Sequence, residues 1–219
     1  MKREVFEKRQ TLLLDKLKNN SSKILQGYAL DKLLFNISGF AIEASFCQAI
    51  KDCLRHTICR LYKMDAALDD NPLLLVTYNY KRADHDQAWK STKQIFDLYD
   101  EIKIEETVFS KANLLSPALA LKSFIKILQI IGGLKPAGSL KERIFMAGRL
   151  IELERLRDDI SNLNIKSKVS LTFFDGGSYE NLITQNLKKR GIKTVTMQHG
   201  QPVFHGNDTD RINQTMILN

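Results

Sequence analysis

The sequence predicts an α/β protein in which a Rossmann-like parallel sheet is flanked by helices and preceded by an N-terminal helical subdomain. Over residues 73–197, short runs of β-branched and aromatic residues alternate with longer amphipathic segments. Residues 1–70 contain only segments of helical periodicity. Residues 169–197 have the order strand, glycine turn, helix and strand, which is the usual connection between neighbouring parallel strands.

The first 70 residues are expected to form a helical hairpin or small bundle, with breaks at residues 19–21 and 38–39. Its third helix has the longest apolar stripe, which we expect to face the core. The stripe consists of Ile42, Phe46, Ala49, Ile50, Cys53, Thr57, Ile58 and Leu61. Three aromatic side chains are assigned to the core rather than to a lipid-docking surface: Phe35, Phe40 and Phe46.

A turn cluster at residues 69–72 marks the expected boundary to an α/β domain of residues 71–205. This domain is predicted to begin with a strand at Leu73–Asn79, a helix from Asp84 and a short strand at Glu101–Ile104.

Two helices with clear start signals follow. Ser116 is an N-cap and Pro117 occupies the first helical position of one helix. Ser139 and Glu142 form a capping box that opens a long helix ending near Asn162.

The last part of the domain is a strand–helix–strand unit. A strand is expected at Val169–Phe174 and a second at Lys193–Met197. Ser178 can cap the intervening helix, and Gly191 ends it. Because parallel strands end at the same edge, residues after both strands should meet where open α/β sheets bind ligands.

His199 is the first candidate for catalysis, since it lies between Gln198 and Gly200 at the carboxyl end of the second strand. An imidazole there can act as a general base near neutral pH. Gly200 would let a substrate approach the backbone closely. The alternative is a histidine that only hydrogen-bonds a neighbouring loop.

Asp175 is the second candidate, because it ends the neighbouring strand and could orient the imidazole or bind a sugar hydroxyl. A turn aspartate that caps the next helix is the alternative. Gly176, Gly177 and Ser178 open that helix, where free amides can hold a phosphate or carboxylate. Lys81 follows the first strand at the same expected edge and could meet an anionic group, unless it belongs to a solvated loop.

Several function classes receive little support. The net charge is +8, but the basic residues are spread along the chain, without the dense stripe of a nucleic-acid binder. The sequence contains no dinucleotide-binding or P-loop glycine motif. His199, His205, Asp208 and Asp210 match no standard metal-ligand spacing, so no metal is expected.

The cysteines and the hydropathy of the sequence favour a location in the cytoplasm. Cys47, Cys53 and Cys59 have neither zinc nor disulfide spacing and are expected as buried thiols in a reducing cytoplasm. The N-terminus lacks the apolar core of a secretory signal, and no apolar run reaches the length of a membrane span.

The run GIKTVTMQHGQP, residues 191–202, resembles the N-terminal half of bacterial surface-polysaccharide glycosyltransferases of the two-Rossmann, GT-B kind. In that family a helix ending in glycine leads to a strand that closes in Gln-His-Gly. The run is also similar to the Trp-His-Gly-Thr-Pro stretch of teichoic-acid glycerophosphotransferases. The histidine of that stretch is held to be the catalytic base, which would correspond to His199.

The match at this motif is partial. Gly200 and Pro202 agree with the glycerophosphotransferase stretch, whereas Gln198 replaces its tryptophan and Gln201 its threonine. These two differences argue against glycerophosphate as the substrate.

The resemblance implies the acceptor-binding half of a glycosyltransferase that moves a sugar from a nucleotide donor to a hydroxyl of a growing surface polysaccharide. The partners would be the nucleotide sugar and a lipid-linked or polysaccharide acceptor, with no cofactor and no nucleic acid. We expect a cytoplasmic protein, peripheral at the inner face of the cell membrane, in which residues 206–219 begin a linker to a C-terminal donor-binding domain. The alternatives are a sugar-phosphate or glycerophosphate transferase, and a non-catalytic glycan-binding or interaction module.

Overall fold

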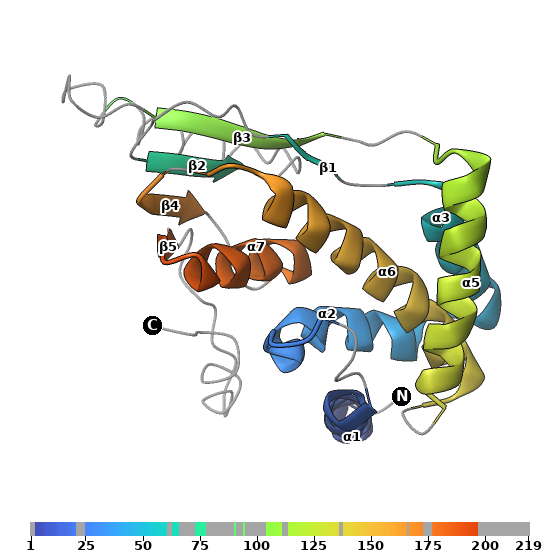
Figure 1. The fold of residues 1–219 in the computed structure, drawn as a ribbon. Helices are drawn as coiled ribbons and strands as arrows, with labels where there is room; N and C mark the ends of the chain where they lie inside the picture. The colour runs from blue at the N-terminus through green and yellow to red at the C-terminus, as the bar shows by residue number, and fades with distance from the viewer. Residues whose placement is uncertain are drawn as a thin grey trace.

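The computed structural model describes residues 3–20, 25–60, 63–65, 73–77, 90, 94, 104–110, 114–135, 138–165, 167–172 and 177–196. The helices are α1 (Arg3–Asn20), α2 (Leu30–Glu43), α3 (Phe46–Ile58), α5 (Pro117–Gly133), α6 (Leu140–Asn162) and α7 (Ser178–Lys189) (Figure 1). The strands are β1 (Lys63–Asp65), β2 (Leu73–Thr77), β3 (Ile104–Ser110), β4 (Val169–Thr172) and β5 (Lys193–Thr196).

The strands form one sheet in the order β1-β3-β2-β4-β5. β3, β2, β4 and β5 run parallel to one another, and β1 pairs with β3 in the antiparallel direction. The predicted strand–helix–strand unit is confirmed, because β4 and β5 are parallel neighbours with α7 between them in sequence. A short parallel sheet is therefore present at one end of the molecule.

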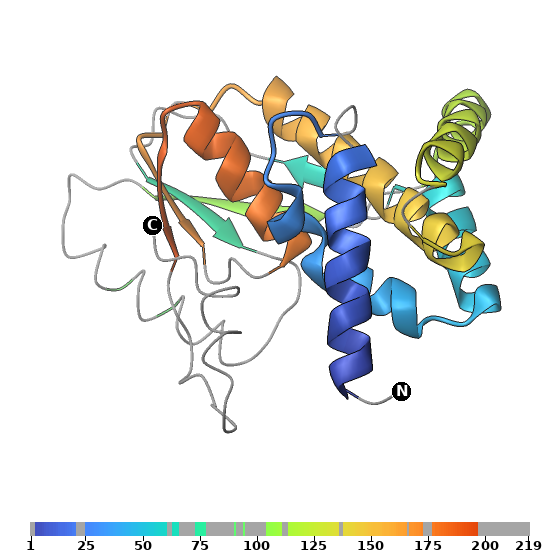
Figure 2. The same cartoon turned by 90° about the horizontal axis from the view of Figure 1, so that it is seen from below.

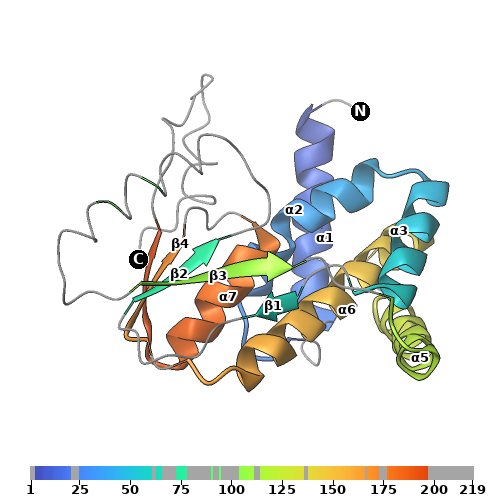
Figure 3. The ribbon, with the colours of Figure 1, turned by 90° about the horizontal axis from the view of Figure 1, so that it is seen from above.

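The prediction of a Rossmann-like α/β fold is nevertheless wrong, because the described part of the chain is mostly helical. Its helices are 12 to 23 residues long, whereas its strands have only three to seven residues. The described helices α2, α6 and α7 lie on one side of the sheet, and α3 and α5 form the far end of the molecule, away from β5 (Figures 1 and 3). The apolar runs that suggested a large sheet give short strands, while the helices supply most of the described core.

The core is centred on α6, which contacts α2, α3, α5 and α7. Met146, Leu150, Leu153 and Leu156 of this helix are almost completely buried. The same cluster of buried side chains includes Leu17 of α1, so it extends to both sides of the predicted domain boundary. α1 packs on α2 at the outside of this layer (Figure 2).

Several local start and stop signals were predicted correctly. Ser116 caps α5 with a proline at its first position, and Ser139 and Glu142 form the expected capping box of α6. Gly191 has φ +77° and ends α7, as expected for a glycine after a helix. Helix α2, in contrast, begins only at Leu30, well after the expected break at residues 19–21, since Leu25 and Gly27 adopt positive φ and interrupt a helix there. The break expected at residues 38–39 is wrong, because α2 runs through these residues to Glu43.

Helix α3 buries only part of the apolar stripe predicted for it. Ala49, Cys53 and Thr57 of the stripe are buried as expected, but Phe46, Ile50 and Ile58 are 48%, 38% and 48% exposed. The three aromatic residues assigned to the core also differ from expectation, since Phe40 is 60% exposed, Phe46 is exposed and Phe35 is only partly buried.

The reason is the close approach of α3 to α6. A Cβ atom added at Gly148 of α6 would lie 2.9 Å from the Cα atom of Cys53. Only small side chains fit at such a contact, so α3 turns its small residues inward and its large apolar residues outward. Of the three cysteines, only Cys53 is buried, whereas Cys47 is exposed and Cys59 is intermediate.

None of the described helices is both long enough and apolar enough to cross a membrane.

Candidate functional site

The edge of the sheet chosen from the sequence is the carboxyl end of β4 and β5. In the parallel register of these strands Thr172 is opposite Thr196, so both strands end at the same level. Of the predicted site residues, Gly177 and Ser178 are described, at the start of α7. The other predicted site residues lie outside the described residues: Lys81, Asp175, Gly176, Gln198, His199 and Gly200.

The first turn of α7 differs from the prediction in two respects. Gly177, rather than Ser178, is the N-cap, and it makes no side-chain capping bond. Ser178 is the first helical residue and is buried. The carboxyl group of Glu180 folds back over this turn, because a Cβ atom added at Gly177 would collide with it.

Glu180 is a residue that the sequence analysis missed. Its side chain is 8% exposed, and burial raises the pKa of its carboxyl group to about 7, although a hydrogen bond from its own backbone amide lowers it in part. A carboxyl group therefore occupies the place where Gly177 and Ser178 were expected to hold an external anion. Its position three residues after Gly177, as in a capping box, was the available signal in the sequence.

A second cluster lies around Arg149 of α6, near the first turn of α7. The Arg149 guanidinium donates a hydrogen bond to Asp52 of α3 over 2.9 Å and also hydrogen-bonds Tyr179 of α7. It lies 5.3 Å from the centre of the Phe145 ring. Burial lowers the pKa of Arg149, but Tyr179 and Asp52 outweigh this effect and raise it overall. Arg149 thus connects three helices and stays charged.

Behind Asp52 lies His56, a completely buried histidine between two carboxylates. Its Nε2 atom is 3.6 Å from Asp52 Oδ2, and its Nδ1 atom is 3.6 Å from Glu152 Oε2. Among the described residues neither ring nitrogen has a hydrogen-bond partner. The sequence analysis did not single out His56, and its four-residue spacing from Asp52 on one helix was the available signal.

Arg155 fixes this cluster to the neighbouring helices. Its Nη1 atom donates to the backbone oxygens of His56 and Cys59 over 2.8 and 3.2 Å, at the end of α3. Its Nη2 atom donates to Ser123 Oγ of α5 over 2.6 Å, and Glu152 lies 3.3 Å away. A cation that binds the last carbonyls of a helix stabilises its C-terminus.

A pocket of about 500 Å³ opens beside this cluster. It is lined by Phe40, Glu43, Ala44, Gln48, Lys51, Asp52, Arg55, Phe145 and Arg149. Asp52 lies between the pocket and His56, whose side chain has no exposed surface. The pocket lining carries three cationic side chains and two carboxylates, and one of these carboxylates, Asp52, is paired with Arg149. The net positive charge of the lining favours an anionic ligand.

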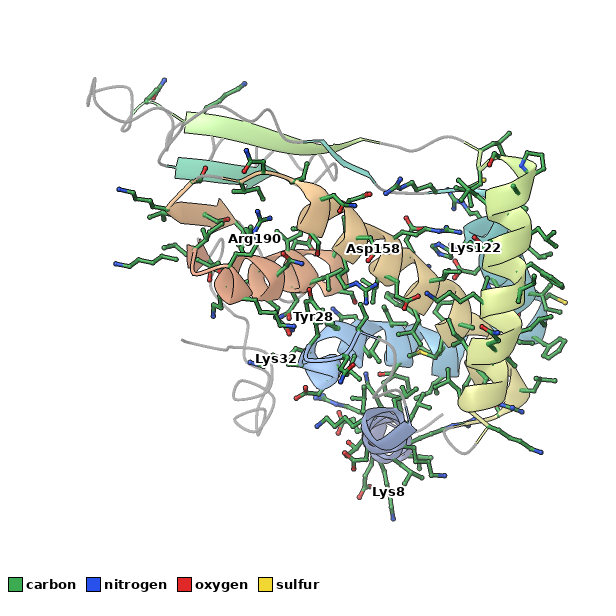
Figure 4. All side chains as sticks on the ribbon, in the orientation of Figure 1. Lys8, Tyr28, Lys32, Lys122, Asp158 and Arg190 are labelled. Carbon is green, nitrogen blue, oxygen red and sulfur yellow. The ribbon has the colours of Figure 1, made fainter. Side chains whose placement is uncertain are left out.

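Polar side chains join α7 to its neighbours, among them Tyr28 and Arg190, which are labelled in Figure 4. Tyr28 accepts a hydrogen bond from Asn186 over 2.8 Å, and the Lys189 ammonium lies 3.3 Å from the centre of the Tyr28 ring. Arg190 donates to the backbone oxygens of Ile160 and Leu163 at the end of α6. These bonds fix the orientation of α7, and hence of its first turn, against α2 and α6.

Within the described residues no group of three histidine, cysteine or acidic side chains is arranged to hold a metal ion. No protein-family model matches the chain, and neither a curated protein nor a solved structure matches it significantly. The family resemblance of residues 191–202 therefore stays a prediction.

Proposed function

We propose that this chain is part of a transferase that moves a sugar from a nucleotide donor to a hydroxyl of a growing surface polysaccharide, at the cytoplasmic face of the cell membrane. His199 is the proposed base that takes the proton from the acceptor hydroxyl. The observation that carries the proposal is the parallel register of β4 and β5, whose common end precedes both candidate segments. His199 in the Gln-His-Gly-Gln-Pro motif that follows β5 would supply the chemistry, with Gln198 and Gly200 beside it.

Glu180 adds to this proposal as a second proton-transfer group near the same edge. Its carboxyl group lies in the first turn of α7, the helix that follows β4 in the sequence. A pKa of about 7 means that protonated and ionised forms coexist near neutral pH. We assign substrate contacts to Gly176, Gln198, Gly200 and Lys81, as expected from the sequence, and assign Gly177 to the packing of Glu180 instead.

The decisive experiment measures sugar transfer by the full-length protein and by its His199→Ala variant. Loss of transfer by at least about a hundredfold, with unchanged circular dichroism, is expected for the loss of a general base. Gln201→Ala, two residues further along the same motif, is the control and should retain most activity. Unchanged turnover in His199→Ala would show that His199 is not the catalytic base.

The choice of donors separates the transferase from its alternatives. Nucleotide sugars and CDP-glycerol are offered to the same preparation, with the polysaccharide or its lipid-linked precursor as acceptor. Transfer from CDP-glycerol alone would replace the glycosyltransferase by a glycerophosphotransferase. Glycan binding without transfer from any donor would indicate a non-catalytic module.

Glu180 also makes a prediction about stability. Because burial raises its pKa from 4.5 to about 7, the folded state favours the protonated carboxyl group. The contribution of Glu180 to the free energy of unfolding is fully present below pH 4.5 and is lost as pH rises through 7. The loss is up to about 3 kcal/mol. Urea unfolding between pH 4.5 and 8 should show a smaller loss of stability with rising pH in Glu180→Gln than in the unmodified protein. Parallel pH curves for the two proteins would contradict the burial of this group.

A further inference from the structure

Helix α3 carries a stripe of large apolar side chains on its outer side. Phe46, Ile50, Leu54 and Ile58 follow one another at intervals of four residues and are 48%, 38%, 50% and 48% exposed. Residues four apart lie on one side of a helix, so these four form a continuous row. Single exposed apolar residues are common, but a contiguous row usually marks an interaction site.

Helix α5, which contacts α3, carries a second set of exposed apolar side chains. Leu121, Phe124, Ile125 and Leu128 are 61%, 43%, 50% and 53% exposed. The two helices are joined where the backbone amide of Leu115 donates to the carbonyl of Ile58 over 2.9 Å. We call the exposed apolar residues of α3 and α5, with Leu114 between them, the outer face; Leu114 is 75% exposed. Figure 3 shows these two helices together at one end of the molecule.

The charges on the outer face are almost all positive. Lys51 and Arg55 of α3 and Lys122 of α5 are exposed beside the apolar row. Helix α5 contains no acidic residue. The one acidic residue of α3, Asp52, is paired with Arg149.

We propose that the outer face binds the surface of an anionic lipid bilayer, with its apolar row among the upper acyl chains and its cations among the lipid phosphates. Helices that lie in a membrane interface have this combination of large apolar side chains and flanking lysine or arginine. Each such cation near an anionic surface adds to the attraction. A second copy of the chain fits less well, because two outer faces would bring Lys51, Arg55 and Lys122 of both copies together. Helix α5 has no carboxylate to balance them, and the one carboxylate of α3, Asp52, is already paired with Arg149.

The pocket beside Asp52 belongs to the same surface. Lys51 and Arg55 line it and also flank the apolar row, and Phe40, 60% exposed, lies at its side. A lipid phosphate held by these cations would lie next to the Arg149 cluster. The binding of lipid is independent of the proposed sugar transfer, and its readout is vesicle binding rather than activity.

The experiment is cosedimentation of the full chain with two kinds of vesicles, phosphatidylcholine alone and phosphatidylcholine mixed with phosphatidylglycerol. Binding to the mixed vesicles that weakens with added salt is expected. The Ile50→Gln and Leu54→Gln double variant should bind at least about tenfold more weakly. Its control is Val5→Gln with Leu12→Gln, two residues of α1 that are 54% and 55% exposed.

A second pair of variants tests the charges. Lys51→Glu with Arg55→Glu should also bind at least about tenfold more weakly. Lys8→Glu with Lys188→Glu makes the same change of net charge at exposed positions elsewhere and should bind nearly as the unmodified protein does (Lys8 is labelled in Figure 4).

Three results would overturn the proposal. The first is no binding to either kind of vesicle, and the second is an equal loss of vesicle binding in a test variant and its control. The third is a protein that does not bind vesicles but forms a dimer, which the Ile50 and Leu54 changes dissociate. Circular dichroism establishes that each variant is folded. If the α3 double variant does not fold, Leu128→Gln on α5 makes the same test from the neighbouring helix.

Discussion

Helices α3 and α6 pack against each other and begin with the same capping motif, yet they differ in the side chains that they bury. Each has a capping box, Ser45 with Gln48 in α3 and Ser139 with Glu142 in α6. Helix α6 buries large apolar residues on several sides, because other helices surround it. Helix α3 buries small and polar residues and exposes its large apolar ones. The difference shows that hydrophobic periodicity defines a face of a helix but not whether that face meets the core.

The largest expected effect concerns the polar side of the α3–α6 contact. In Glu152→Ala, the buried guanidinium of Arg155 loses a carboxylate 3.3 Å away, and His56 loses one of its two acidic neighbours. Removing one partner of a buried ion pair should lower the free energy of unfolding by about 3–5 kcal/mol. Chemical denaturation measures the change.

Asp158 of the same helix provides the control for Glu152. Its ion pair with Arg157 is solvent-exposed, so Asp158→Ala should change the free energy of unfolding by less than about 1 kcal/mol (Figure 4). Similar losses in both variants would mean that the buried cluster does not hold α3 against α6.

The next effect compares one leucine from each helix. Leu150 of α6 is completely buried, so Leu150→Ala should destabilise the protein by about 2–5 kcal/mol through lost burial and a cavity. Leu54 of α3 is 50% exposed, and Leu54→Ala should change stability by less than about 0.5 kcal/mol. Thermal unfolding of the two variants side by side is the measurement. A large loss in Leu54→Ala would show that the outer face is covered in the protein.

The smallest effect tests the close approach of the two helices. In Gly148→Ala the new Cβ atom would meet the Cα atom of Cys53, and the crowding should lower stability by about 1–2 kcal/mol after the gain in helix propensity. Gly132 of α5 has free space around its Cα atom, so Gly132→Ala should stabilise the protein by about 0.5–1 kcal/mol. The midpoint of urea unfolding is measured for both variants. Equal shifts of this midpoint in Gly148→Ala and Gly132→Ala would show that α3 and α6 are not in tight contact.

The sequence was sufficient for features that depend on neighbouring residues. The capping residues Ser116 and Ser139, the terminating Gly191 and the parallel pair β4 and β5 were all predicted, because each depends on a few adjacent positions. The helical spacing of Leu182, Ile183 and Leu187 in the sequence likewise agrees with the one apolar face that α7 packs on the core.

Features that depend on partners far along the chain were missed. Nothing near Cys53 indicates that Gly148 of a helix far along the sequence approaches it, and this contact decides which face of α3 is buried. The sequence analysis also underestimated how much of the chain is helical. Short apolar runs indicate strands but do not show how short those strands are. The catalytic assignment of His199 and its neighbours depends on residues outside the described ranges and stays a prediction.

The bond from Arg155 to the backbone oxygen of His56 has a consequence for synthesis of the protein. Its two ends are 99 residues apart in sequence. At about 5–20 residues per second, the ribosome would need roughly 5–20 s to make Arg155 after His56. During that interval neither the Arg155 guanidinium nor the rest of α6 would cover the polar side of α3. The apolar row of α3 would already be outside the ribosome. The first three helices would therefore be most prone to capture by chaperones, or by a membrane, before the chain is complete.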